Sequence, residues 1–203
     1  MTMSKAAHGL LITVALSLLA APQQAPDSTG PEYTSDGQLQ FPSHYREWVY
    51  LSTGFDMSYN RDSQRTDMHM FDNVFVNPAA YRDFQRSGSW PDKTMFALEV
   101  RNARSRGSIN QSGSFQSDVA GVEIHVKDNS RFSGDWAFFG FDQPLQKNAR
   151  MIPGSASCYS CHAAHGAVNT TFVQFYPTLL PIAQSKGTLS EAYKQDMSTM
   201  GAK

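Results

Sequence analysis

Both cysteines of this 203-residue chain lie within five consecutive residues, Cys158-Tyr159-Ser160-Cys161-His162. This C-x-x-C-H spacing is the attachment signature of a c-type haem. Positions i and i+3 share one face of a helical turn, so both thiols can bond haem vinyl groups while His162 reaches the iron. We therefore predict one covalently bound haem c, attached through Cys158 and Cys161, with His162 as axial ligand. No cysteine remains for a disulfide, so the haem must help to organise the core.

Other uses of this motif fit the sequence less well. A thioredoxin-like C-x-x-C would follow the first strand of a βαβ unit, whereas this motif begins at residue 158. Zinc could be bound by Cys158, Cys161, His162 and His165, but the adjacent residues Cys161 and His162 are poorly placed to occupy two corners of one tetrahedron. His165 is interpreted as a solvated histidine after the haem helix, or alternatively as a proximal-side donor or haem-propionate contact.

Residues 1–25 have the features of an export signal. Lys5 gives a positive start, and residues 9–21 are a 13-residue stretch without a charge, too short to span a bilayer. Small residues at Ala20, Ala21 and Ala25 offer cleavage points. We expect a cleaved signal peptide and a periplasmic protein with no further membrane segment; the alternative is an uncleaved N-terminal anchor.

Composition excludes several classes of partner. Lys and Arg number 17 against 18 Asp and Glu, so no strong field favours nucleic acid or anionic lipid. Charged residues make up only 17% of the chain, which argues against a highly charged disordered protein. We expect a flexible lead-in at 26–41, one haem-binding domain at 42–187 and a C-terminal tail at 188–203.

The middle of the chain has the alternation of strands. Apolar residues recur with a period of two in Met95–Arg101 and again around Val122, Ile124 and Val126. Residues 105–116 are rich in turn formers, and the aromatic run Trp136–Phe141 follows a Gly-Asp turn. Strands joined by turns predict an antiparallel sheet. The expected fold class is α+β, an antiparallel β-sheet with a few short helices and a haem motif late in the chain.

Short helices are predicted on either side of these strands. One begins at Ser43 and ends by Thr53-Gly54. Another covers residues 79–86, with Asn77 as cap, Pro78 as its first residue and Gly88 as its stop. Near the C-terminus we expect a strand at Thr171–Tyr176 and a helix at Pro177–Ser185 that ends before Gly187.

The position of the haem motif bears on the sixth ligand of the iron. Small electron-transfer cytochromes usually carry the motif near the N-terminus with an axial methionine later, but only 41 residues follow His162 here. Met197 and Met200 lie in the predicted tail, and no upstream methionine is singled out by its spacing. An apolar sheet over the distal face would leave the iron five-coordinate and open to small molecules.

Several segments in order resemble the cytochrome P-460 and cytochrome c′-beta family. They are Tyr45–Trp48, Asn77–Tyr81, Gly88–Asp92, Val126–Asp128, Gly134–Phe138 and the late Cys158–His162. The resemblance, over residues 45–181, implies an antiparallel-sheet haem protein, commonly a homodimer, with His162 as proximal ligand. Members of the family bind nitric oxide and similar ligands, or oxidise hydroxylamine.

One departure from the family bears on activity. The resemblance implies that hydroxylamine-oxidising members carry a strand lysine cross-linked to the haem. The matching strand is placed at Met95–Arg101, which contains no lysine; Lys93 lies in the preceding turn and Lys127 ends another strand. A missing cross-link favours the gas-binding branch, or an oxidase that works with an ordinary haem c.

Other residues are candidates for the pocket. Glu99 could take protons from bound hydroxylamine if its face of the strand meets the distal side; otherwise it is an exposed carboxylate paired with Arg101. Arg101 could contact a haem propionate. Phe96 and Leu98 are expected in the core and as distal lining, and His125 as an exposed strand residue.

We therefore expect a periplasmic mono-haem c-type cytochrome that binds or oxidises small nitrogen compounds such as nitric oxide and hydroxylamine. In the enzymatic version, electrons would pass to a soluble acceptor such as a cytochrome c. The alternatives are a low-spin electron carrier with a Met or His sixth ligand, and a gas-binding protein without turnover. Whether the chain is an enzyme stays open at this point.

Overall fold

The computed structural model describes residues 30–58, 69–134, 136–142 and 146–201. The predicted signal peptide, the first residues of the lead-in and the polar loop between residues 59 and 68 lie outside these ranges. Among the helices that the structure describes, none is long and apolar enough to cross a membrane.

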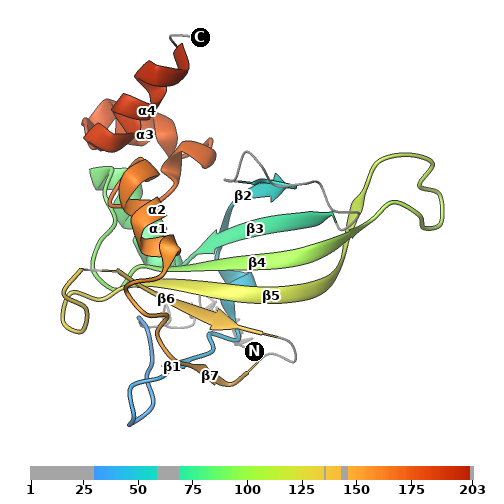
Figure 1. Cartoon of the computed structure of the whole chain (residues 1–203), viewed down its shortest axis with the longest axis horizontal. Coiled ribbons are helices and arrows are strands. Elements are labelled where there is room, and N and C mark those ends of the chain that lie inside the picture. Colours follow the sequence, from blue (N-terminus) through green and yellow to red (C-terminus); the bar gives the residue numbers. More distant parts are fainter. Residues whose placement is uncertain (1–29, 59–68, 135, 143–145, 202–203) are drawn as a thin grey trace, which may run out of the picture.

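A five-stranded antiparallel sheet forms the centre of the protein (Figure 1). Its strands lie side by side in chain order, β2-β3-β4-β5-β6, and every neighbouring pair is antiparallel. Their bounds are β2 Val49–Phe55, β3 Met70–Val76, β4 Met95–Arg104, β5 Phe115–Lys127 and β6 Trp136–Phe141. A separate ribbon pairs β1, Leu39–Gln40, with β7, Asn148–Ala149. The α+β class and the three predicted strands are confirmed.

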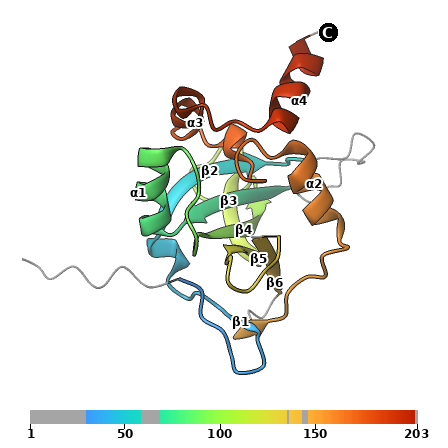
Figure 2. The same cartoon turned by 90° about the vertical axis from the view of Figure 1, so that its left-hand side faces the viewer.

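Helices cover one face of the sheet and the small ribbon lies on the other (Figure 2). The helices are α1 Pro78–Ser87, α2 Ser157–His165, α3 Leu180–Lys186 and α4 Glu191–Gly201, with 3-10 turns η1 at Tyr45–Glu47 and η2 at Val173–Phe175. Two hydrophobic clusters result, one on each face. Strand β4 serves both, because Phe96 packs in the helix-side cluster while Met95 and Ala97 pack in the ribbon-side cluster.

Two local predictions are wrong. The helix expected after Ser43 is confined to η1, and the chain from Val49 onward is the edge strand β2, which pairs with β3. Its β-branched and aromatic residues suit a strand, and the ladder to β3 satisfies backbone groups that a helix would have paired internally. The strand expected at Thr171–Tyr176 is instead a tight turn followed by η2.

Helix α1 follows the prediction closely. It begins with Pro78 after Asn77 and ends at Gly88, whose φ of 75° is the left-handed conformation that glycine adopts without strain. The Asn77 side chain does not cap α1, however; its Oδ1 accepts the backbone N–H of Met95 at 2.8 Å. Asn77 therefore ties the start of α1 to the start of β4.

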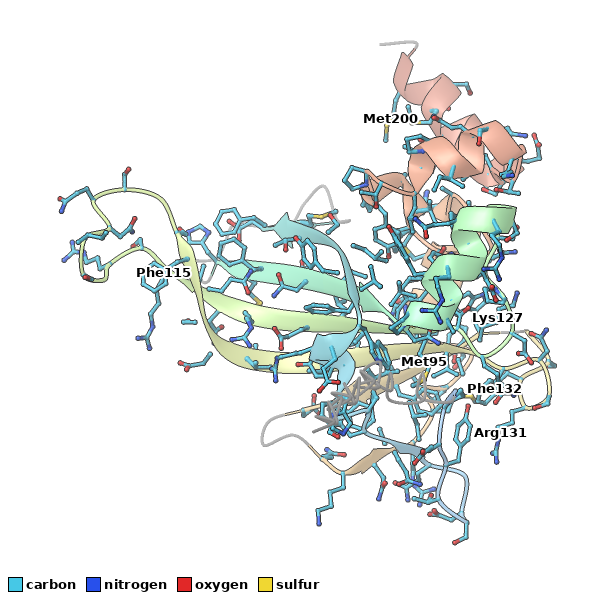
Figure 3. The ribbon with its side chains drawn as sticks, turned by 180° about the vertical axis from the view of Figure 1, so that it is seen from behind. Met95, Phe115, Lys127, Arg131, Phe132 and Met200 are labelled. Carbon is cyan, nitrogen blue, oxygen red and sulfur yellow. The ribbon has the colours of Figure 1, made fainter. Side chains whose placement is uncertain are left out.

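The described part of the lead-in, residues 30–41, packs against the core. Leu39 is fully buried in the ribbon-side cluster, contrary to the expectation of a flexible lead-in over 26–41. Tyr33 donates a hydrogen bond to Asp128 at 3.3 Å and stacks beneath the Arg131 guanidinium, 3.9 Å from its ring centroid. These contacts hold the segment against the β5–β6 connection, where Arg131 and Phe132 are labelled in Figure 3.

The two ends of the molecule project away from the sheet. Strands β4 and β5 extend beyond β3 into a long hairpin whose loop exposes Ile109, with Phe115 at its base (Figure 3). Helix α4 projects from the opposite end and carries the exposed Met200. It is nevertheless anchored, because Tyr193 is buried in the helix-side cluster.

Candidate haem-binding site

The three motif residues of α2 border one cavity. Its volume is about 700 Å³, within the range usual for ligand pockets. Cys158, Cys161 and His162 all line it, and both cysteines are half-buried free thiols. Because α2 follows a loop after β7 in a wholly antiparallel arrangement, the motif lacks the strand–helix setting of a thioredoxin-like site.

The sheet forms the opposite wall. Phe96, Leu98 and Val100 alternate along β4 and all line the cavity, as the period of two requires for one face of a strand. Val74 of β3 and Ser52 and Gly54 of β2 continue the wall, and Phe172, Phe175 and Tyr176 close it beyond α2. The lining is therefore mainly apolar, with a few polar groups whose positions matter.

His162 is held in one orientation. Its Nδ1 lies 2.8 Å from the carbonyl oxygen of Thr170; a carbonyl can only accept, so Nδ1 carries the proton. Its ring packs against Phe172 and Phe138, with centroid distances of 4.2 and 4.8 Å, and against His125 at 5.1 Å. The unprotonated Nε2 is the nitrogen left to bind a metal.

Burial lowers the pKa of His162 to about 4, and the neighbouring His125 adds to the shift. The hydrogen bond to Thr170 acts in the opposite direction but does not offset it. At neutral pH the imidazole is therefore uncharged, which is the form that ligates iron.

Glu99 and Arg101 are not in this pocket. They lie on the ribbon-side face of β4, opposite Phe96 and Leu98, so the expectation that Glu99 faces the distal side is wrong. Neither is Glu99 exposed: it is 2% accessible and bonded to Tyr45, Arg46 and Arg101. Arg101 also donates to the Ser117 carbonyl at 2.7 Å, so its guanidinium is committed away from a propionate.

Glu99 belongs to a buried polar network. Burial alone would raise the pKa of its carboxyl, but the hydrogen bonds from Arg101, Tyr45 and Arg46 outweigh it and hold the pKa below its ordinary value. The carboxylate therefore stays ionised and ties η1 to the middle of β4.

Two polar residues of β5 reach the cavity instead. Glu123 pairs across the sheet with Leu98, and His125 pairs with Phe96, so both share the pocket face. His125 Nε2 lies 3.8 Å from Glu123 Oε2, and this interaction holds the pKa of Glu123 below its ordinary value. The alternation around Val122–Val126 already places both on one face. The sequence alone predicts that the Glu123–His125 face is exposed, because the residues of the opposite face, Val122, Ile124 and Val126, are all apolar.

Asp72 of β3 adds a second carboxylate to the lining. Within the part of the chain that the structure describes, its side chain has no hydrogen-bond or ion-pair partner. Burial, and then the charges of Glu123 and Asp56, raise its pKa above the ordinary value. The pocket thus holds two acids of different character, one favoured in its charged form and one disfavoured.

The remaining sequence candidates lie elsewhere. His165 is bound to Asp196 of α4 at 2.7 Å and is not part of the lining. Met197 and Met200 are exposed on α4, whereas Met57 does border the cavity. No lysine contributes to the lining formed by the described residues.

These residues fit a covalently attached haem. Two free thiols one helical turn apart and a neutral, oriented imidazole face a single cavity with a large apolar wall. This donor set would supply both vinyl attachments and one axial ligand from nine residues of helix.

Comparison with known proteins agrees with the geometry. The sequence model of the family described as Cytochrome P460 matches residues 42–173, which include the whole central sheet and the motif on α2. No curated protein matches the chain.

Proposed function

The chain belongs to the cytochrome P460 family and so is a haem-binding cytochrome, and from this premise we propose that it is a periplasmic mono-haem c protein that binds small nitrogen compounds, with nitric oxide as its principal ligand. Cys158 and Cys161 would hold the haem covalently and His162 would be its proximal ligand. When bound, the haem supplies an iron that coordinates the small ligand. The protein's export rests on the signal-like residues 1–25.

One observation carries the proposal: an apolar sheet wall faces the attachment helix across the cavity. Phe96, Leu98 and Val100 carry no group that could ligate iron, so this wall would leave the sixth position of the iron free for a diatomic or similarly small molecule. His125 lies on the same face of the sheet, but its ring centroid is only 5.1 Å from that of His162, which leaves no space for a haem between the two imidazoles as a sixth ligand would require. The rings of His125, His162 and Phe138 all contact one another, so His125 packs beside His162 and not across the cavity from it.

Hydroxylamine oxidation is the second candidate, and Glu123 is the observation that favours it. A carboxylate kept ionised at the pocket can accept the protons that leave hydroxylamine on oxidation. The electrons would require an acceptor, for which a soluble cytochrome c is the proposed partner. The pocket's lack of a described lysine favours the binding function over that of cross-linked oxidases.

The optical spectrum of the purified ferrous protein tests the open site. We expect a high-spin spectrum that changes when carbon monoxide or nitric oxide is added to protein that contains one haem per chain. A six-coordinate low-spin spectrum indifferent to carbon monoxide would instead establish the electron-carrier alternative, with Met57 as the first ligand to replace by Ala.

Turnover separates the binder from the enzyme. Hydroxylamine and an artificial electron acceptor are added to the holoprotein, with an equal concentration of free haem as the reference. A rate no greater than the reference supports binding alone, whereas a rate well above it supports the oxidase. Cell fractionation of the tagged full chain tests export, and its sedimentation tests the homodimer that the family resemblance implies.

A further inference from the structure

A strained turn carries the carbonyl that His162 contacts. The turn consists of residues 167–171, directly after α2. Asn169 and Thr170 have φ angles of 47° and 58°, in the left-handed region. Asn tolerates this conformation, but for a β-branched residue such as Thr it is a genuine outlier. Such strain persists only where the surroundings impose it, and it concentrates at functional sites.

Trp90 imposes the conformation from outside the turn. Its backbone N–H donates to Asn169 Oδ1 at 3.1 Å, and its indole Nε1–H donates to Thr171 Oγ1 at 2.8 Å. Within the turn, the Thr171 hydroxyl donates to the Val168 carbonyl at 2.6 Å, and the backbone N–H of Thr171 donates to the same carbonyl at 2.8 Å. Trp90 is 2% exposed, so its two bonds join the turn to the rigid core.

Gly166 brings the turn against the end of α2. A Cβ at this position would lie 2.5 Å from the Thr170 carbonyl carbon and 2.7 Å from the His162 carbonyl oxygen. Both are backbone atoms, which cannot move aside as a side chain can. A glycine is therefore required for the Thr170 carbonyl to approach closely enough to accept the hydrogen bond from His162 Nδ1–H.

We propose that Gly166, the turn 167–171 and Trp90 form a proximal clamp that sets how strongly His162 donates electrons to the haem iron. The clamp acts by fixing the length and direction of the Nδ1–H···O=C bond to Thr170. An imidazole whose Nδ1–H donates to a good acceptor is a more basic ligand through Nε2, and its ring cannot rotate. This inference rests on the proposed axial role of His162. None of the clamp residues is a catalytic residue; they are positioning residues.

Gly166→Ala tests the clamp in the holoprotein, with Gly154→Ala as its matched control. Gly154 has open space around its Cβ position, so the same substitution there disturbs nothing. We expect Gly166→Ala to lower the iron–histidine stretching frequency of the ferrous protein and to shift the reduction potential to more positive values, since a weaker donor stabilises ferric iron less. Gly154→Ala should leave both at their wild-type values. Wild-type values in a folded Gly166→Ala protein would overturn the proposal.

Trp90→Phe decides the question if Gly166→Ala does not fold. It keeps an aromatic ring in the core but removes the indole donor to Thr171, which loosens the turn. Trp136→Phe is the matched control, because Trp136 is also a buried tryptophan of the helix-side cluster. We expect both variants to lose stability but only Trp90→Phe to shift the potential positively. Equal potentials in the two variants would show that the turn is merely structural.

Failure of the clamp is distinguishable from failure of the proposed function. The reduction potential can be measured whether or not the sixth position of the iron is open. A wild-type protein that ignores carbon monoxide would therefore remove the gas-binding proposal but leave this test in place. A protein whose haem is not ligated by His162 at all would remove both, and His162→Ala, which should then keep the wild-type spectrum, identifies that case.

Discussion

Leu98 of β4 and Glu123 of β5 are direct cross-strand partners, and both side chains border the cavity beside α2. The pair places a carboxylate on a mainly apolar wall. Glu99, the next residue along β4, points to the other side of the sheet. Glu123 shares the cavity face with its partner Leu98, whereas Glu99, one residue further along β4, stabilises the fold on the opposite face.

Glu123→Gln should change the electrostatic environment of a bound ligand without changing the haem attachment. Negative charge near the ligand opposes back-donation from iron, so its removal should lower the C–O stretching frequency of the ferrous carbon monoxide complex. Infrared spectroscopy at neutral pH measures this shift. Glu99→Gln is the control and should leave the frequency unchanged; an unshifted band for Glu123→Gln would place its carboxylate away from the ligand.

Replacing Cys158 and Cys161 together by Ser should abolish covalent haem, because in the proposed attachment each thiol would provide one of the two thioether bonds. Haem staining of a denaturing gel reads the result directly. Ser160 lies on the same turn of α2 and is exposed to solvent, so Ser160→Ala is the control and should keep the stain at wild-type intensity. A stained band in the double variant would contradict the attachment site.

Glu99→Gln should destabilise the protein by about 2 kcal/mol at pH 7, because it leaves the guanidinium groups of Arg46 and Arg101 without their shared carboxylate. The figure is below the roughly 3–5 kcal/mol usual for a broken buried pair, because Arg46 is half exposed and solvent screens its charge. Urea unfolding measures the loss. Glu47→Gln, at a side chain that is 78% exposed, should change the stability by less than about 0.5 kcal/mol.

The same network makes a prediction about pH. The pKa of Glu99 is lower in the folded than in the unfolded protein, so its contribution is present above the ordinary glutamate range and is lost as the pH falls through the folded value. Wild-type protein should therefore lose stability on acidification below about pH 4.5, and Glu99→Gln should lose less over the same interval. Parallel curves for the two proteins would contradict the assignment.

Asp72→Asn should have the opposite effect on stability. The raised pKa of Asp72 means that its charged form is disfavoured in the fold, so the wild-type aspartate costs stability at pH 7 and costs less as the pH falls toward the ordinary carboxyl range. The amide removes this charge and should stabilise the protein at pH 7 by on the order of 1 kcal/mol. Thermal unfolding at pH 7 and at pH 3.8, the ordinary pKa of Asp, measures the difference, which should shrink at the lower pH. Asp118→Asn, on an 81% exposed side chain, should show no such dependence.

Local patterns sufficed for much of the fold. Alternation in Met95–Arg101 and Trp136–Phe141 predicts strands, and the Asn77-Pro78 start with the Gly88 stop predicts α1, because each signal acts within a few residues. The prediction failed at Val49–Phe55, where pairing with β3 decides the conformation and the pairing partner lies some twenty residues away in the chain.

The haem motif and its chemistry are written in five consecutive residues, since one helical turn places Cys158, Cys161 and His162 together whatever the rest of the chain does. Which acid faces them is a tertiary matter. Both faces of β4 are apolar and both are covered, one by helices and one by the β1–β7 ribbon, so alternation shows that Glu99 and Leu98 face opposite ways but not which faces α2. The same holds for Thr170, whose carbonyl reaches His162 only because Trp90, eighty residues earlier in the chain, holds a strained turn in place.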